Sequence, residues 1–538
     1  MRTFTTVIAL TLFPVFVSAQ AIEAWASRYS FTTGTDNAKA MALDDSCNVY
    51  VTGSSVSGGP GTEDYNTVKY NTFGIQQWVK RYNGPAGGVD IGRAIAVDPA
   101  GYIYVTGSSA VASGYSDCLT IKYDLNGDTL WTARYNGTGN KNDIAYAIAV
   151  DDSGNVYITG STEGTVGTHG IYEDYITIKY NTSGVQMWAS QYNGPGGDFD
   201  AAYSVAVDGS GNVIVTGESG GGSSSSSDPY QDYATVKYSV TGTLVWAKRY
   251  NGLLTTANDQ ATRVVTDNTD NVYVTGRSEG ITSYDDYLTI KYNAAGTLQW
   301  TARYNGSAND NDEAKSLSVD TAGNCFVTGI AFGGSSTGFD MVTVKYNTSG
   351  SESWARTFDL LSTDDDGGYW IEVDTVSNVY VTGYALSAST AKDYVTAKYD
   401  SSGTMLWSIN YSNSNAVGSS DIPSCLKVDQ YGDVYVTGMS ALDYATVKYS
   451  ESTGYNAVVA PEIYFNIFPN PGNGLFHMKG AAPGSTVDIT DNTGRIVYSA
   501  LYSTDQIAVQ LDAGIYIVAV TTPDGIRSTA KMVIENAK

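Results

Sequence analysis

Histidine is nearly absent from this chain, and basic residues are scarce. The 538 residues include 2 His, and 30 Lys and Arg stand against 55 Asp and Glu, which gives a net charge of -25. His169 lies in a variable segment and His477 lies beyond the repeats described below, so neither a histidine-dependent triad nor a His-rich metal site is expected within them. The acidic surplus would repel a phosphate backbone, which excludes nucleic acid as a partner.

Cysteine and long apolar runs are also rare. Cys47, Cys118, Cys325 and Cys425 have neither metal-ligand nor disulfide-framework spacing, so we predict that they are buried small hydrophobes. After the N-terminal stretch no apolar run approaches the roughly 20 residues that span a bilayer. The sequence therefore predicts no transmembrane segment.

The N-terminus, "MRTFTTVIALTLFPVFVSAQA", carries one Arg, an apolar stretch and then small residues. This layout is typical of a secretory signal peptide over residues 1–19, cleaved between Ala19 and Gln20. A buried helix is the alternative.

What is abundant is a repeat. Its tryptophans are Trp25, Trp78, Trp131, Trp188, Trp246, Trp300, Trp354 and Trp407, spaced by 53, 53, 57, 58, 54, 54 and 53 residues. In the third unit "AYAIAVD", "GNVYITG", "DYITIKY" and "VQMWASQY" read as four short strands separated by Gly, Asn and Asp. Repeated four-stranded units predict an all-β fold, an eight-bladed β-propeller over residues 20–450.

The ends of the repeat do not match. The first tryptophan strand, "EAWASRYS", has no preceding partner, and the last "DYATVKY" has no tryptophan strand after it. We therefore expect the N-terminal strand to complete the last blade, which leaves no open sheet edge, with a linker over residues 451–462. The alternative is that "GYNAVVAP", with Gly454 in register, is a decayed eighth outer strand.

The motifs "AVDxxGNVYVTG", "DYxTxKYN" and "GxxxW" recur over residues 22–450. Through them the chain resembles the bacterial β-propeller repeat proteins usually described as seven-bladed, although eight copies are present here. The glycine-to-tryptophan spacing also resembles the docking motif of eight-bladed quinoprotein dehydrogenases. That family's adjacent cysteine pair is absent, so a quinoprotein function is not favoured.

Loop lengths predict one invariant face and one variable face, and the variable face carries two acidic rings. The third strands open with one ring, from Asp64 to Asp443. The other, here called the entrance ring, precedes the first strands and consists of Asp36, Asp90, Asp143, Asp200, Asp259, Asp312, Asp366 and Asp421. Such residues can cap backbone N–H groups or bind a cation, and calcium is the candidate cofactor. Asp364, Asp365 and Asp366 in "STDDDGG" form a local candidate, and the loop residues Tyr172 and Tyr230 could stack on sugars.

The repeat stops before Ile463, and "IYFNIFPNPGNGLFHMKG" opens a new pattern of alternating strands. This predicts a small Ig-like β-sandwich over residues 463–538. The tail resembles the C-terminal sorting domain of the bacterial type IX secretion system through Pro469, Asn470, Pro471, Gly494, Arg495, Gly514 and Tyr516. The resemblance implies passage through that machinery across the outer membrane, tail removal, and surface attachment or release. A small autonomous adhesion domain is the alternative.

Together these features indicate a secreted, surface-displayed, monomeric propeller that serves as a binding or structural module for a surface polysaccharide or protein ligand. No catalytic residue is assigned. The alternative is a secreted carbohydrate-active hydrolase or lyase that uses paired carboxylates on the variable-loop face.

Overall fold

The computed structural model describes residues 20–32, 34–56, 58–59, 61–164, 173–195, 199–221, 230–254, 257–281, 284–334, 338–359, 365–386, 391–413, 419–452, 466–468, 475–479, 484–491, 495–502, 506–521 and 527–534. The chain divides into two compact units, Met1–Ser452 and Thr453–Lys538. The expected signal peptide lies outside the described residues. None of the described residues forms a helix long and apolar enough to cross a membrane.

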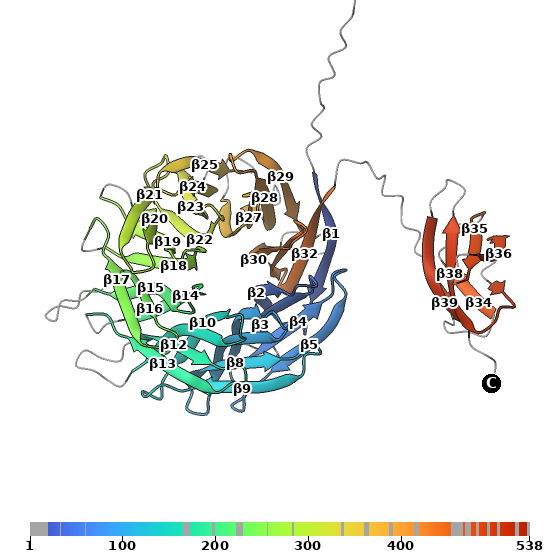
Figure 1. Ribbon diagram of the computed structural model, residues 1–538, viewed down its shortest axis with the longest axis horizontal. Coiled ribbons are helices and arrows are strands. Elements are labelled where there is room, and N and C mark those ends of the chain that lie inside the picture. Colours follow the sequence, from blue (N-terminus) through green and yellow to red (C-terminus); the bar gives the residue numbers. More distant parts are fainter. Residues whose placement is uncertain are drawn as a thin grey trace, which may run out of the picture. The chain divides into compact units, whose positions relative to one another are not determined.

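The described part of the first unit is all β and propeller-like, with four-stranded antiparallel sheets arranged in a ring (Figure 1). The first strands, which face the centre of the ring, are β2 (Asp36–Leu43), β6 (Asp90–Val97), β10 (Asp143–Val150), β14 (Asp200–Val207), β18 (Asp259–Thr266), β22 (Asp312–Val319), β26 (Gly367–Val373) and β30 (Asp421–Val428). The second strands are β3 (Val49–Val56), β7 (Ile103–Ala110), β11 (Val156–Glu163), β15 (Val213–Gly220), β19 (Val272–Glu279), β23 (Cys325–Gly334), β27 (Val379–Leu386) and β31 (Val434–Ser440).

The third strands are β4 (Glu63–Tyr70), β8 (Ser116–Tyr123), β12 (Glu173–Tyr180), β16 (Gln231–Tyr238), β20 (Asp285–Tyr292), β24 (Gly338–Tyr346), β28 (Lys392–Tyr399) and β32 (Asp443–Ser452). The outer strands, which carry the repeated tryptophans, are β5 (Gln76–Tyr82), β9 (Thr129–Tyr135), β13 (Gln186–Tyr192), β17 (Leu244–Tyr250), β21 (Leu298–Tyr304), β25 (Glu352–Phe358), β29 (Met405–Tyr411) and β1 (Gln20–Tyr29).

Short polar turns connect the strands where the sequence places Asp, Asn and Gly. In the turn between β10 and β11, Asp151 Oδ1 accepts hydrogen bonds from the backbone N–H of Ser153 (3.0 Å) and Asn155 (2.8 Å). Gly154 has a φ of 76°, a conformation that residues with a Cβ seldom adopt. The carboxylate therefore fixes the turn and sets the register of the hairpin.

Each first strand contains a β-bulge at the same place. In β2 the register shifts between Ala38 and Ala40, and the other first strands shift at the equivalent position. The extra residue is unpaired in the ladder, as is usual at a bulge. A bulge changes the direction in which side chains point. Residues at and beside these bulges line the cavity described below.

The core lies between neighbouring sheets, where the second and third strands are almost fully buried. The repeated tryptophans join one sheet to the next: Trp131 packs on Gly184, and its Nε1 donates to the carbonyl of Thr182 over 3.1 Å. A Cβ at Gly184 would lie 2.6 Å from the Trp131 ring, so glycine is needed there. The four cysteines are buried and free, as predicted.

The last sheet contains strands from both ends of the first unit. Strand β1 pairs antiparallel with β32, and Trp25 lies opposite Lys448. This is the arrangement expected for the N-terminal strand. The decayed-strand alternative placed residues 454–461 at this edge of β32, and the structure places β1 there instead; those residues themselves lie outside the described part.

The expected linker starts too early. Strand β32 continues through Ser452 because Gln20 and Ala21 of β1 pair with Ser452 and Glu451. Glu451 also replaces the missing turn of the last sheet, since its Oε1 accepts a hydrogen bond of 2.7 Å from Trp407 Nε1. Residues 451 and 452 thus belong to the ring of sheets.

The second unit contains β33 (Asn466–Phe468), β34 (Leu475–Lys479), β35 (Thr486–Thr490), β36 (Ile496–Leu501), β37 (Gln506–Ala508), β38 (Gly514–Thr521) and β39 (Arg527–Ile534). They form one three-stranded and one four-stranded sheet, which share a buried cluster that includes Phe476, Ile489 and Val518. Pro469, Asn470, Pro471 and Gly494 lie outside the described residues.

Three predicted sorting residues are described. The Nε of Arg495 donates to Asp491 Oδ2 over 3.1 Å, Gly514 begins β38, and the hydroxyl of Tyr516 donates to the carbonyl of Asp512 over 2.9 Å.

Candidate functional site

The structure places the entrance ring at the start of the first strands, as buried caps. Asp90 Oδ2 accepts a hydrogen bond from Gly84 N (2.6 Å) and its Oδ1 accepts one from Ala110 N (3.1 Å). The equivalent carboxylates accept from the backbone N–H of Phe31, Gly137, Gly194, Gly252, Gly306, Leu386 and Asn413. Each side chain thereby ties the loop between two sheets to a first or second strand.

Burial controls the acidity of this ring. It raises the pKa of Asp143, Asp200, Asp259 and Asp312 to about 6, although hydrogen bonds to each carboxylate work in the opposite direction. Among the described residues no group of three or more His, Cys, Asp or Glu side chains could hold a metal ion. Calcium binding at the entrance ring stays a prediction.

The local candidate in "STDDDGG" is only partly described, because Asp364 lies outside the described residues. Asp365 Oδ1 accepts a hydrogen bond of 2.9 Å from Phe339 N, and Asp366 Oδ1 accepts one of 3.2 Å from Leu386 N. These two carboxylates hold backbone groups of neighbouring segments.

Carboxylates that open the third strands are paired as well. Arg303 Nη1, for example, lies 2.9 Å from Asp286 Oδ2 and also donates to the carbonyl of Ser278 over 2.6 Å. The same pairing joins Arg28–Asp443, Arg81–Asp64, Arg134–Asp117 and Arg249–Asp232. These contacts occupy five of the eight carboxylates that open the third strands. Tyr172, one of the two candidates for sugar stacking, lies outside the described residues, and the carbonyl of the other, Tyr230, accepts from Gly221 N over 2.9 Å.

A cavity of about 570 Å³ lies at the centre of the ring and is lined by residues from the first strand of every sheet. This volume is within the range of about 300–1,000 Å³ that is usual for small-molecule sites. The charged residues of the lining are Lys39, Arg93, Arg263, Lys315 and Lys427, and the lining contains no Asp or Glu. The interior of the ring is therefore basic, although the whole chain carries a net charge of -25.

The basic residues of the cavity come from strands on opposite sides of the ring. Lys39 and Arg93 come from the neighbouring strands β2 and β6, and Arg263 and Lys315 come from β18 and β22. The order of first strands around the ring is β2, β6, β10, β14, β18, β22, β26 and β30, so β2 lies opposite β18 and β6 lies opposite β22 (Figure 1). Between these walls stand Tyr146 and Tyr203 on one side and Tyr369 and Trp370 on the other.

Only part of this positive charge is neutralised by the described residues. Lys315 Nζ lies 2.6 Å from Glu313 Oε1, and Lys427 forms an ion pair with Glu372. The Glu372 carboxylate also accepts from Trp370 Nε1 over 3.1 Å. Burial opposes both charges of the Lys427–Glu372 pair, but their mutual attraction raises the pKa of Lys427 and lowers that of Glu372.

Lys39, Arg93 and Arg263 have no ion-pair partner among the described residues. Arg93 and Arg263 lie 5.4 Å and 4.4 Å from the ring centres of Tyr146 and Trp370, while their Nε atoms are buried without a hydrogen-bond partner. The amide of Asn37, when its oxygen faces Lys39 Nζ, accepts a hydrogen bond of 3.1 Å. Burial, and secondly the nearby charge of Arg93, lower the pKa of Lys39. Burial also lowers the pKa of Arg263.

The tyrosines beside the cavity are held in place. The rings of Tyr146 and Tyr203 are 5.4 Å apart, and the Tyr203 hydroxyl donates to Glu218. Gln260 Nε2 donates to the other oxygen of Glu218 over 2.7 Å. Glu218 lies on β15, outside the cavity lining, and both of its oxygens have partners.

Sequence reasoning missed this cavity, although the sequence holds a signal for it. Three residues after each entrance-ring Asp, the repeat has Lys39, Arg93, Tyr146, Tyr203, Thr262, Lys315, Tyr369 and Ser424. The flanking positions are mostly small or apolar, whereas this one changes from copy to copy. A variable position inside an otherwise regular strand is the mark of a residue that does not pack in the core.

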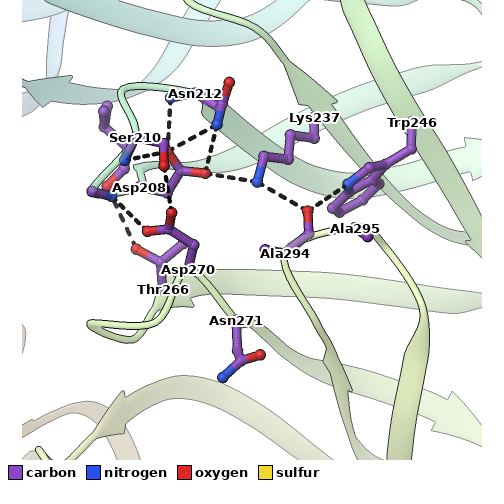
Figure 2. A network of polar contacts seen from close by, with 12 residues as sticks. Asp208, Ser210, Asn212, Lys237, Trp246, Thr266, Asp270, Asn271, Ala294 and Ala295 are labelled. Atoms are coloured by element: carbon purple, nitrogen blue, oxygen red, sulfur yellow. Dashed lines mark hydrogen bonds and ion pairs between the residues drawn. The ribbon is translucent and has the colours of Figure 1, made fainter.

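A separate buried ion pair lies on the invariant face and has a structural role (Figure 2). Lys237 Nζ lies 2.7 Å from Asp208 Oδ2 and donates to the carbonyl of Ala294 over 3.1 Å. Asp270 of the neighbouring sheet accepts from Gly209 N and from Ser210 Oγ. Trp246 Nε1 donates to the same carbonyl of Ala294 over 3.3 Å, so the network joins two sheets.

Comparison with known proteins supports two parts of the chain. Residues 466–535 match the family model of the secretion system C-terminal sorting domain, and residues 77–113 and 131–167 match that of the beta-propeller repeat. The resemblances to bacterial β-propeller repeats and to the type IX sorting domain are thereby confirmed. The type IX sorting domain indicates a secreted or cell-surface protein that interacts with the secretion machinery.

Individual relatives are distant. An uncharacterized WD repeat-containing protein of Acanthamoeba polyphaga mimivirus is 26% identical over 221 residues, which span 36% of this chain and 14% of that protein. PorZ, an essential surface component of the type-IX secretion system of Porphyromonas gingivalis, aligns over 94% of this chain and 82% of its own with 13% identity and a TM-score of 0.26. A catalytically inactive virginiamycin B lyase from Staphylococcus aureus aligns over 79% of this chain and 98% of its own with 10% identity and a TM-score of 0.41.

Proposed function

We propose that this chain, which carries a type IX sorting domain, is a surface-displayed binding module whose eight-bladed β-propeller holds a ligand in its central cavity. The observation that carries the proposal is the sorting-domain match over residues 466–535. A chain with this tail is exported, and the remainder of the chain is then its cargo. In this division residues 20–452 form the propeller and residues 463–538 form an Ig-like sorting domain.

The topology supports eight blades. Within residues 20–452, the described strands make eight four-stranded sheets in sequence order around the ring, the last of which combines β30, β31 and β32 with β1. A sheet built from both ends closes such a ring and removes the open edge that would otherwise invite pairing with another chain. The count of sheets therefore supports the proposed blade number.

The polar groups support binding rather than acid–base chemistry on the variable face. The entrance-ring carboxylates accept backbone hydrogen bonds, and third-strand carboxylates pair with arginines. Groups held in this way are not poised to protonate a leaving group or activate water. The cavity, by contrast, is concave, of ligand size, and lined by Lys39, Arg93 and Arg263, which have no ion-pair partner among the described residues.

Export can be tested in the bacterium that encodes the chain. Deletion of residues 463–538 is expected to leave the protein inside the cell envelope, whereas the intact chain becomes accessible to protease added to whole cells. As a matched gain-of-function arm, residues 453–538 fused to a periplasmic fluorescent protein should bring that reporter to the surface. The proposal would be overturned if the truncated chain were displayed normally, or if the fused reporter did not reach the cell surface.

A further inference from the structure

The central cavity has more positive charge than its own residues neutralise. Five Lys and Arg line it, and the carboxylates that pair with them are Glu313 and Glu372, which leaves three positive charges in excess. Lys39 is exposed and Arg93 and Arg263 are half-buried, so an anion in the cavity could reach all three and form charge-assisted hydrogen bonds with them. In a chain of net charge -25, such a cluster is not a consequence of composition.

We propose that the central cavity binds a small organic dianion, one negative group of which contacts Lys39 and Arg93 and the other Arg263, whose guanidinium lies on the ring of Trp370. This inference rests on the proposed binding function and deepens it by naming the ligand chemistry. Arg263 comes from β18, on the opposite side of the ring from β2, and extends to Trp370 of β26, so one compact anion is a poorer fit than a molecule with a negative group at each end. Arginine suits this role because its planar group can hold a carboxylate through two hydrogen bonds.

The geometry of the two arginines supports this assignment. Their Nε atoms are buried and lack a hydrogen-bond partner, while each guanidinium lies against an aromatic ring. Stacking fixes the plane of a guanidinium and leaves its N–H edge free to donate. Desolvation, and secondly the charge of Arg93, lower the pKa of Lys39, and an anion between the two side chains would relieve their repulsion.

The aromatic neighbours limit what surrounds the anionic groups. Trp370 is already engaged by Arg263, with Lys427 5.4 Å from its ring centre. The Tyr203 hydroxyl is held by Glu218, and Tyr146 and Tyr203 present their rings beside the cavity. This wall is apolar and aromatic, so the middle of the ligand can be an aliphatic chain or a sugar ring. Two sources share the required chemistry: a simple dicarboxylate and an acidic disaccharide.

The test uses isothermal titration of the purified full chain at low ionic strength. Adipate and digalacturonate carry two carboxylates, acetate carries one, and maltose carries none. We expect adipate or digalacturonate to bind at least about tenfold more tightly than acetate, and added salt to weaken that binding. Tighter binding of digalacturonate would identify an acidic saccharide, and tighter binding of adipate a simple dicarboxylate.

Matched variants locate the site. Arg93→Gln and Arg263→Gln should each weaken binding of the better dianion by about tenfold, which is the loss expected for one charge-assisted contact. Lys80→Gln removes the same charge from an exposed pair with Asp128 outside the cavity and should bind as the original chain does. Without ligand, Arg93→Gln should leave the melting temperature unchanged or raise it, because it removes repulsion from Lys39.

Three results would overturn the proposal: no binding of either dianion, equal binding of maltose or acetate, or dianion binding that survives both arginine substitutions. A fall in the melting temperature of ligand-free Arg93→Gln would assign that arginine a structural role instead. None of these results bears on export, so a normally displayed protein that ignores dianions would keep the proposed surface module and reject only this ligand.

Discussion

At the scale of single residues, the turn Asp of each sheet keeps a side-chain partner even where the repeated tyrosine that usually donates to it is replaced. In six sheets the turn Asp accepts a hydrogen bond from a second-strand tyrosine hydroxyl, as in Tyr50 to Asp44 over 2.9 Å. Ile214 and Phe326 occupy this tyrosine position in the other two sheets. There Lys237 pairs with Asp208, and Ser377 Oγ donates to Asp320 Oδ2 over 3.0 Å. The carboxylate keeps a partner in every copy.

Loss of the Lys237 amine should destabilise the ring much more than loss of an equivalent lysine. Lys237→Met leaves the buried Asp208 without its cation, and breaking a buried pair costs about 3–5 kcal/mol. The control is Lys69→Met, because Tyr50 already satisfies Asp44 and the Lys69 side chain is more exposed. We expect a loss of less than about 1 kcal/mol for that control.

Chemical denaturation followed by tryptophan fluorescence measures both losses. Introducing Ile214→Tyr into Lys237→Met should recover part of the stability, since it restores the hydroxyl that the other sheets use. Equal losses for the two lysines would show that the buried pair contributes no more than a surface contact.

At the scale of elements, the entrance ring determines how each sheet meets the next. Its carboxylates accept backbone N–H groups from the loop that leaves the preceding outer strand, for example Gly137 N to Asp143 Oδ2 over 2.7 Å. The loop then enters β10 in a fixed direction. Buried carboxylates in this position gain hydrogen bonds but lose hydration. Their raised pKa values show that the loss of hydration has the larger effect on the charged form.

Stability should therefore increase as the pH falls from 7 to 5. Burial raises the pKa of Asp143, Asp200, Asp259 and Asp312 to about 6, above the ordinary value of 3.8. In this window the folded state binds more protons than the unfolded state, so the free energy of unfolding rises as the pH falls. The turn residues Asp151 and Asp267 have lowered pKa values, so their contribution is lost only at lower pH, below about 4.

Equilibrium unfolding at pH 7, 5 and 3 tests this order. Asp143→Asn in the same series should flatten the change between pH 7 and 5, because the amide does not titrate. A free energy of unfolding that falls steadily from pH 7 to 5 would contradict the assignment.

At the scale of the whole ring, the boundaries of the sequence repeat do not coincide with the boundaries of the sheets. The repeat-family matches begin in the outer strand, at residues 77 and 131, and continue through the first and second strands of the next sheet. Each repeat therefore contributes to two sheets. The final sheet is completed by β1, which pairs with β32 and places Trp25 Nε1 3.0 Å from the carbonyl of Thr72 in the next sheet.

Deletion of residues 20–30 should open the ring. It removes the partner of β32 and the contact of Trp25 with the Gly74 turn, and large-to-small changes at such packed aromatic sites cost about 3–5 kcal/mol. The bare edge of β32 should also cause concentration-dependent association. Thermal unfolding and light scattering after size-exclusion chromatography measure both effects.

A synthetic peptide of residues 20–30 should restore the melting temperature and the monomer when added in trans, whereas a scrambled peptide should not. A deleted chain that stays monomeric with an unchanged melting temperature would show that β1 does not close the ring.

The sequence by itself determined the repeat, the strands, the turns and the closing strand, because the alternation of apolar residues and the chemistry of Asp and Gly turns act within a few neighbouring residues. It also identified the sorting tail, whose motif residues are local. It placed the linker two residues early, since the role of Glu451 depends on Trp407 in the neighbouring sheet.

Only the tertiary structure shows that basic side chains from distant repeats line one central cavity. Lys39 and Arg263 are more than two hundred positions apart, and nothing local relates them. Ring closure brings the first strands around one axis, and the bulge in each of them alters which side chains line the cavity. The entrance ring, prominent in the sequence, is buried as backbone caps, while Lys39, Arg93 and Lys315 three residues later line the basic cavity together with Arg263 and Lys427. Long-range placement of charge depends on closure of the chain, which no short stretch of sequence records.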